Sequence, residues 1–147
     1  MPLLESDLAA ITPEPSPPAS DRAPEWVAAG TPEPLRSQLV DLLGEDRVLS
    51  RASDIIRYAS DASPYRKLPQ VVIMARDAGD VGKVLEYGRR TGMPVTFRAG
   101  GTSLNGQGQT DSILVDVRKH FGGVTVLDEG ARVKTGPGVV LGDVNKV

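Results

Sequence analysis

A strand–helix–strand pattern in the middle of the chain constrains the fold more than any other feature. The run QVVIMA (70–75) is short, apolar and rich in β-branched residues, which predicts a buried strand. Asp77 can cap the helix that follows, whose apolar stripe includes Val84 and which ends at Gly92. A second strand is expected over MPVTF (93–97). Such elements joined by short connections indicate a right-handed parallel βαβ unit.

The residues after this unit indicate further strands. A third strand is predicted over SILVDV (112–117), and two alternating runs around Asp-Glu-Gly predict a hairpin over 123–136. The residues expected on the buried side of the hairpin are Val124, Val126, Ala131 and Val133. GPG (136–138) predicts a tight turn, and VVLGDVNKV predicts a helix that has no stop signal, so we expect the natural protein to continue. The expected fold class is α+β, a βαβ unit followed by mixed strands and a hairpin.

The N-terminal part of the chain has a different composition. Eight of the twelve prolines lie in the first 34 residues, and such a segment buries too little apolar surface to offset chain entropy. We therefore expect a disordered, proline-rich tail over 1–30 and one domain over 31–147. In that domain Thr31 is expected to cap a helix that stops at Gly44, and a second short helix is expected over 51–59.

Composition excludes several classes of function. A net charge of -2 gives no electrostatic basis for binding nucleic acid. The chain has no cysteine, which excludes a thiolate metal site, and its single histidine, His120, makes a histidine metal site or a Ser-His-Asp triad hard to build. No run approaches the ~20 apolar residues that span a bilayer, and no secretory signal is present. We expect a protein that is cytoplasmic or peripheral to the inner membrane, with no bound metal.

The segment RAGGTSLNGQGQT (98–110) is the candidate binding loop. Its glycines permit positive φ, which lets consecutive backbone N–H groups converge on an anion such as a diphosphate. Thr102, Ser103 and Gln107 add neutral polar groups, and Arg98 brings a positive charge to the start of the loop. Composition alone is equally compatible with a flexible surface loop, although a loop of this length between core strands favours a function.

Two familiar phosphate-binding motifs do not match this loop. Gly101 and Gly106 have the spacing of GxxxxGK[ST], but Gln107 stands where the lysine belongs, which argues against nucleotide hydrolysis. The dinucleotide fingerprint GxGxxG is absent, and the element that follows the loop is a strand and not a helix.

The motifs PVTFRAGGTSLNGQ, ILVDVRKHFGGVTVLDEG and GPGVVLGDVN, in this order, resemble the N-terminal half of the FAD-binding domain of FAD-linked oxidases. This PCMH-type fold is shared with vanillyl-alcohol oxidase and p-cresol methylhydroxylase, and the nearest branch is the D-lactate and glycolate dehydrogenases. The family loop commonly reads PRGGGTSxxGQ, so Phe97 replaces the proline and Ala99 the first glycine. Ala99 is tolerable where its φ stays negative. The resemblance implies FAD contacts at Arg98, Ala99, Gly100, Gly101, Thr102, Ser103, Gly106, Gln107, Gly138 and Val139.

The resemblance also implies an activity. A D-2-hydroxy acid such as D-lactate or glycolate is the expected small-molecule substrate, and a quinone, cytochrome or iron-sulfur module is the expected electron acceptor. Catalytic residues are expected beyond residue 147, so none is named and the fragment alone is expected to be inactive. A non-catalytic α/β module that binds a nucleotide or a protein remains the alternative, as does a reductase of the cell-wall sugar type with the same fold.

Overall fold

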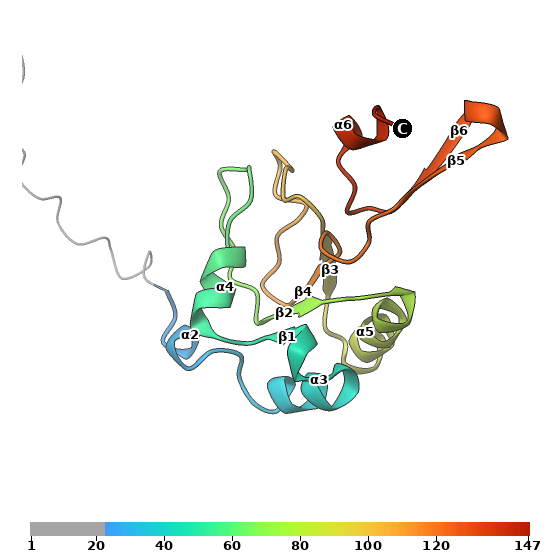
Figure 1. The fold of residues 1–147 in the computed structure, drawn as a ribbon. Helices are drawn as coiled ribbons and strands as arrows, with labels where there is room; N and C mark the ends of the chain where they lie inside the picture. The colour runs from blue at the N-terminus through green and yellow to red at the C-terminus, as the bar shows by residue number, and fades with distance from the viewer. Residues whose placement is uncertain (1–22) are drawn as a thin grey trace, which may run out of the picture.

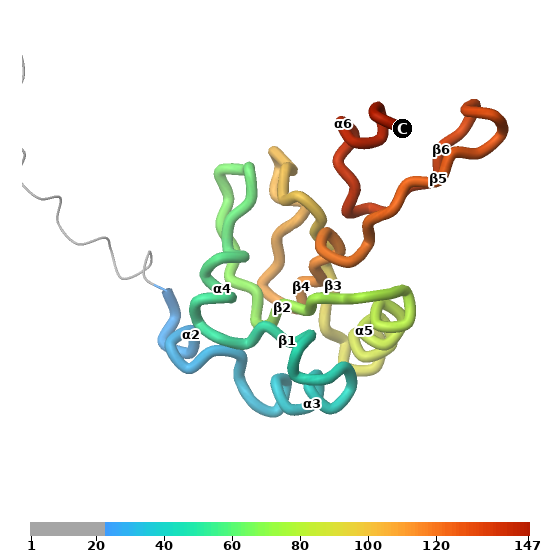
Figure 2. The backbone as a smooth tube through the Cα atoms, in the orientation of Figure 1, coloured from blue at the N-terminus to red at the C-terminus, as the bar shows by residue number. Residues whose placement is uncertain are grey.

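A computed structural model describes residues 23–147, and residues 1–22 of the expected tail lie outside the described residues. The described chain forms a four-stranded sheet with helices packed against it, from which a two-stranded hairpin extends (Figure 1). The backbone tube shows that the hairpin and the final short helix lie on the same side of the molecule as two long loops (Figure 2). The helices are α2 (Trp26–Ala29), α3 (Leu35–Leu43), α4 (Ala52–Tyr58), α5 (Ala78–Thr91) and α6 (Leu141–Val144), with 3-10 turns at Glu45–Arg47 and Asp128–Gly130.

The sheet has the strand order β1-β2-β4-β3. Its members are β1 (Val48–Leu49), β2 (Val71–Met74), β3 (Val95–Arg98) and β4 (Ile113–Asp116). Strands β2, β4 and β3 are parallel, whereas β1 pairs antiparallel with β2. The expected βαβ unit is present as β2, α5 and β3, but β4 lies between its two strands. Three parallel strands therefore end at one edge of the sheet.

Side chains alternate between the two faces of the sheet along the parallel strands, and both faces are buried. Odd-numbered side chains such as Ile73 and Val115 join a core with α3 and α5, while α4 lies against β2 on the even-numbered side. Val72 and Leu114 are buried on that second side. Both faces of β2 and β4 are thus covered, as expected for parallel strands. The main core consists of Leu35, Leu39, Leu43, Val48, Val71, Ile73, Ala75, Val84, Tyr87, Ile113, Val115 and Val117.

Helix α5 has the ends that its sequence predicts. The Asp77 carboxylate accepts a 2.9 Å hydrogen bond from the Asp80 N–H, and Gly92 adopts the left-handed conformation that ends the helix. Gly88 is buried, and a Cβ at this position would meet Val95 Cγ2 at 2.7 Å. The absence of a side chain here allows α5 to approach β3 closely.

The N-terminal end of the domain differs from the expectation. Packing begins a few residues before Thr31, because Val27 of α2 is buried. The prediction that Thr31 caps the next helix is wrong: α3 begins at Leu35, and the Thr31 N–H donates instead to the Ser50 carbonyl at 2.8 Å. The predicted stop of α3 at Gly44 is confirmed, as is a short helix within 51–59.

The hairpin consists of β5 (Val124–Leu127) and β6 (Arg132–Thr135), joined at Asp-Glu-Gly as predicted. The expected burial of one side is wrong, since Val126 and Val133 remain 44% and 42% exposed and Ala131 is also exposed. The reason is that the hairpin extends away from the four-stranded sheet, so no element of the described residues covers it (Figure 1).

Candidate functional site

The carboxyl ends of the three parallel strands bring together segments that are distant in sequence. Met74, Arg98 and Asp116 are the last residues of β2, β3 and β4. The glycine loop, residues 98–108, leaves this edge beside the α4 loop, residues 59–66. In open α/β sheets, ligands bind outside the carboxyl ends of the strands. A ligand-binding site is therefore expected at this edge of the sheet.

Six consecutive amides of the glycine loop are free for a ligand, whereas three of its carbonyls are bonded within the protein. The Arg98, Gly101 and Gly106 carbonyls accept hydrogen bonds from the N–H groups of Val117, Ala62 and Gln109 at 2.9, 2.9 and 3.1 Å. The N–H groups of residues 99–104, in contrast, make no hydrogen bond within the described part of the chain. A run of consecutive unpaired amides is an arrangement that can hold an anion.

The small residues of the loop have different roles in this geometry. Gly101 has φ +66°, and a Cβ there would meet the Arg98 guanidinium at 2.7 Å. A Cβ at Gly100 would meet nothing closer than Thr102 Cγ2, at 3.5 Å, so this surface is open. The backbone of Ala99 lies outside the left-handed region and its methyl group packs against the core. The departure from the family glycine therefore brings no strain.

Arg98 is occupied within the protein. Its guanidinium donates to the carbonyl of Tyr58 at 2.8 Å and also to that of Ser60, and it lies over the Tyr58 ring, 5.5 Å from its centre. These carbonyls follow the last turn of α4, where a positive charge is favourable. The side chain thus ties the glycine loop to the α4 loop, and in this arrangement its N–H groups point at protein carbonyls.

The distal half of the glycine loop is organised by Ser103. Its hydroxyl donates to the Gln107 side-chain oxygen and accepts from the Gln107 N–H at 3.1 Å. Gly106, at φ +76°, faces the Tyr65 ring, which a Cβ would meet at 3.0 Å. Thr102 and Gln107 are exposed at the surface of the loop. The sequence-predicted residues from 98 to 107 therefore lie on one loop, in which Ala99 packs against the core and Gly100, Thr102 and Gln107 are exposed.

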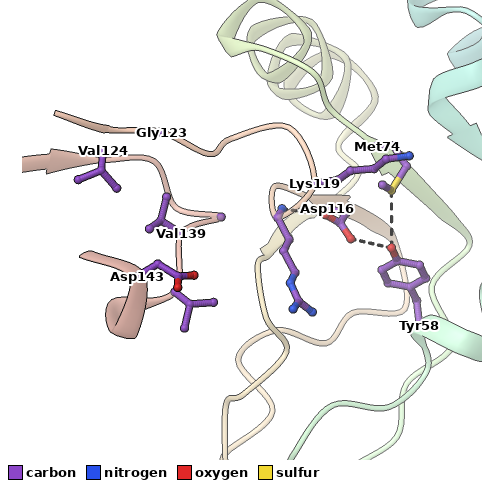
Figure 3. A pocket seen from close by; sticks show the side chains of 11 residues that line it. Tyr58, Met74, Asp116, Lys119, Gly123, Val124, Val139 and Asp143 are labelled. Carbon is purple, nitrogen blue, oxygen red and sulfur yellow. Dashed lines mark hydrogen bonds between the residues drawn. The ribbon is translucent and has the colours of Figure 1, made fainter. Parts of the chain in front are cut away.

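A separate cleft of about 670 Å³ lies beside this loop, between the sheet edge and the segment that follows the hairpin. Figure 3 shows Tyr58, Met74 and Asp116 on one side of it and Val139 and Asp143 on the other. Gly138 and Val139, two of the residues that the family resemblance implies, line this cleft, whereas the implied residues from 98 to 107 do not. A Cβ at Gly138 would also collide with the Arg118 carbonyl, so glycine is required here for packing.

A hydrogen-bonded pair forms one wall of the cleft. The Tyr58 hydroxyl lies 2.6 Å from Asp116 Oδ2 and 3.6 Å from the Met74 sulfur (Figure 3). The other Asp116 oxygen accepts from the Arg118 N–H at 2.8 Å. Burial, together with the hydrogen bond to Asp116, raises the pKa of Tyr58 to about 12. The Tyr58 phenol therefore stays protonated at neutral pH.

Sequence reasoning missed several residues of this edge. Tyr58, Arg118 and Lys119 line the cleft, and the last two place positive charge beside it. The available signal was the position of Arg118 and Lys119 directly after a buried strand. Nothing local marked Tyr58, which reaches the cleft only because α4 packs on β2. His120 is exposed.

The described residues contain neither a metal-binding cluster nor a membrane-spanning helix. Among residues 23–147, no group of three or more His, Cys, Asp or Glu side chains is placed to hold a metal ion. Within the same residues, no helix has the length and apolar character needed to cross a membrane.

Comparison with known proteins identifies the family. The model of the FAD binding domain family matches residues 69–147, slightly more than half of the chain. The chain is 35% identical over 91 residues to a D-2-hydroxyglutarate dehydrogenase of Pseudomonas putida, covering 59% of this chain and 9% of that protein. It is 27% identical over 113 residues to the glycolate oxidase subunit GlcD of Bacillus subtilis, covering 75% of this chain and 24% of that protein. The chain thus spans less than a quarter of the length of either relative.

Structural comparison supports the same assignment. p-Cresol methylhydroxylase superposes with a TM-score of 0.58 over 75% of this chain and 23% of that chain, at 17% sequence identity, which confirms the expected PCMH-type fold. The unpaired amides of residues 99–104 and the open surface at Gly100 fit the paired phosphates of the cofactor that this family binds. The chain belongs to the FAD binding domain family.

Proposed function

We propose that the glycine loop holds the pyrophosphate of FAD through the backbone N–H groups of residues 99–104. The observation that carries this proposal is the run of unpaired amides at residues 99–104, in a loop fixed by the hydrogen bonds of the Arg98, Gly101 and Gly106 carbonyls. Thr102, Ser103, Gly106 and Gln107 complete the surface around the phosphates. Arg98 contributes by fixing the loop, since its guanidinium donates to the carbonyls of Tyr58 and Ser60.

The adjoining cleft is proposed to receive the rest of the cofactor. Gly138 and Val139 lie on one side with Asp143, and Arg118 and Lys119 provide cations that can pair with phosphate oxygens. The protonated Tyr58 phenol donates a hydrogen bond to the Asp116 carboxylate. This carboxylate therefore has a partner beside the proposed phosphate site. FAD, when bound, supplies the acceptor for a hydride.

The proposed activity is the oxidation of a D-2-hydroxy acid by a longer protein that contains this chain. The support is similarity to proteins named D-2-hydroxyglutarate dehydrogenase and glycolate oxidase subunit. D-Lactate and glycolate are the first substrates to test, with D-2-hydroxyglutarate beside them. Electrons are proposed to leave to a quinone, a cytochrome or an iron-sulfur module. The residues that touch the substrate are proposed to lie outside these 147 residues.

The test is an absorption spectrum of the full-length gene product, followed by anaerobic addition of each hydroxy acid. A flavin spectrum that is bleached by a D-2-hydroxy acid but not by its L enantiomer is the expected result, with achiral glycolate tested on its own. A folded, colourless protein that takes up no added FAD would overturn the cofactor assignment and favour a non-catalytic module. A flavin that none of these acids reduces would overturn the substrate class alone.

A further inference from the structure

Gln109 is a second side chain, besides Arg98, that links the glycine loop to the α4 loop. Its side-chain N–H group lies 2.7 Å from Asp61 Oδ1 and 2.8 Å from the Tyr65 carbonyl, and Ser63 Oγ is 3.2 Å away. Gln109 is only 9% exposed. Its own N–H donates to the Gly106 carbonyl, so this residue fixes both the end of the glycine loop and its distance from the α4 loop.

Asp61 is the acceptor at the centre of this contact. It also accepts from the Ser63 N–H at 2.8 Å and from the Ser63 hydroxyl at 2.5 Å. The Ser63 hydrogen bonds, aided by Gln109, hold the pKa of Asp61 below its usual value of 3.8. Asp61 is therefore a carboxylate at neutral pH, and the bond that Gln109 donates to it is charge-assisted.

The cluster is not explained well by stability alone. Asp61 Oδ2 and Gln109 Oε1 are both buried without a hydrogen-bond partner among the described residues. Buried acceptors without donors cost folding free energy. What the cluster does achieve is geometric, because with the Ala62 N–H bond to the Gly101 carbonyl it holds the glycine loop against the α4 loop along its length.

We propose that Gln109 and Asp61 are positioning residues that hold the glycine loop in the form in which its amides of residues 99–104 face the FAD pyrophosphate. This inference rests on the proposed function, and it gives the α4 loop a part in positioning the glycine loop. Neither side chain touches the cofactor itself. Their removal should weaken FAD binding while the rest of the domain stays folded.

The experiment uses the full-length protein, stripped of flavin and titrated with FAD. Gln109→Glu places a second carboxylate against Asp61 and should weaken FAD binding by roughly tenfold or more. Adding Asp61→Asn places an amide donor opposite the introduced carboxylate and should regain most of the lost affinity.

A matched control is available in the same chain. Gln70 also makes a bond between segments, donating to the Asp111 carbonyl at 3.1 Å, but it precedes β2 at the opposite edge of the sheet. Gln70→Glu should leave FAD affinity unchanged. An equal loss in this control, or no recovery in the Gln109→Glu/Asp61→Asn double variant, would overturn the positioning role.

Two further outcomes separate the proposals. A wild-type protein that takes up no FAD defeats the proposed function, whereas a wild type that binds FAD and a Gln109→Glu variant that binds equally well defeat only the positioning role. Should Gln109→Glu fail to fold, Gln109→Leu removes the donor without adding charge. Unchanged affinity in a folded Gln109→Leu variant would then overturn the inference.

Discussion

The Tyr58 hydroxyl lies 2.6 Å from the Asp116 carboxylate, joining the last residue of α4 to the last residue of β4 across the wall of the cleft. The two residues are 58 positions apart in sequence. This contact places a neutral phenol and a paired carboxylate at the carboxyl edge of the parallel strands, next to the loop that is proposed to bind phosphate.

The first prediction concerns the titration of Tyr58. Burial and Asp116 raise its pKa from 10.0 to about 12. Because the folded value exceeds the unfolded one, the contribution of this group to stability is complete below pH 10 and is lost as pH rises through about 12. Asp116→Asn should lower the pKa of Tyr58 but leave it above 10.0, since burial is the larger cause. Ultraviolet absorbance of tyrosinate measures the change.

Tyr87 is the internal control for this titration. Burial also raises the pKa of Tyr87, but its hydroxyl donates to the neutral amide oxygen of Gln38 at 2.7 Å. Asp116→Asn should therefore leave the pKa of Tyr87 unchanged. A shift of both tyrosines together would mean that the substitution had disturbed the whole fold.

The second prediction concerns Gly100. Its φ is not positive and a Cβ would meet no atom closer than 3.5 Å, so Gly100→Asp should fold normally. A carboxylate beside the phosphates should weaken FAD binding by roughly tenfold or more. Gly82→Asp is the control, because it adds the same charge on α5, where nothing lies within 4 Å of the new Cβ. Titration of the flavin-free full-length variants with FAD measures both affinities. Equal affinities of the two variants would contradict phosphate binding by the glycine loop.

The third prediction concerns the ion pair of Asp80. Its carboxylate is nearly buried, lies 3.1 Å from Arg47 Nε and accepts from the Arg76 N–H at 3.0 Å. Asp80→Asn should lower the free energy of unfolding by roughly 1.5–3 kcal/mol, because it removes the charge from these contacts. Asp46→Asn, in an exposed pair with Arg76, should cost about 1 kcal/mol or less. Denaturant unfolding measures the free energy of unfolding of both variants. Equal losses would show that burial does not make the Asp80 contacts more important for stability than the exposed pair.

The fourth prediction locates the start of the packed domain. Val27 is 2% exposed, so Val27→Ala should reduce the free energy of unfolding by roughly 1.5 kcal/mol or more through two lost methyl groups and the resulting cavity. Val126→Ala is the matched substitution on the exposed hairpin and should change stability by about 0.5 kcal/mol or less. A negligible change in the free energy of unfolding of Val27→Ala would indicate that the packed domain begins at Thr31 and not before it.

Local sequence patterns predicted most of the elements. Asp77 and Gly92 delimit α5, the apolar runs at 70–75 and 112–117 contain β2 and β4, and the Asp-Glu-Gly turn joins the hairpin. Each of these depends on residues a few positions apart, since capping, helical spacing and turns are short-range interactions. The family motif likewise lies within one continuous loop. Its residue-by-residue contacts with FAD stay a prediction.

Long-range contacts decided the rest. The insertion of β4 between β2 and β3, the burial of Val27 and the exposure of the hairpin depend on which surfaces meet, and no local pattern specifies this. The same holds for Arg98, whose charge suggests a phosphate ligand until the structure shows two protein carbonyls in contact with it.

By itself, the sequence determined that a glycine-rich loop follows the second strand of the βαβ unit. Backbone freedom and strand propensity depend on neighbouring residues, so a local pattern can predict both. Only the tertiary structure decided that Gly101 and Gly106 turn their carbonyls inward, and that Asp61 and Gln109 join the two loops. Hydrogen bonds between distant segments form only once the chain has packed, and they determine which backbone groups remain free for a ligand.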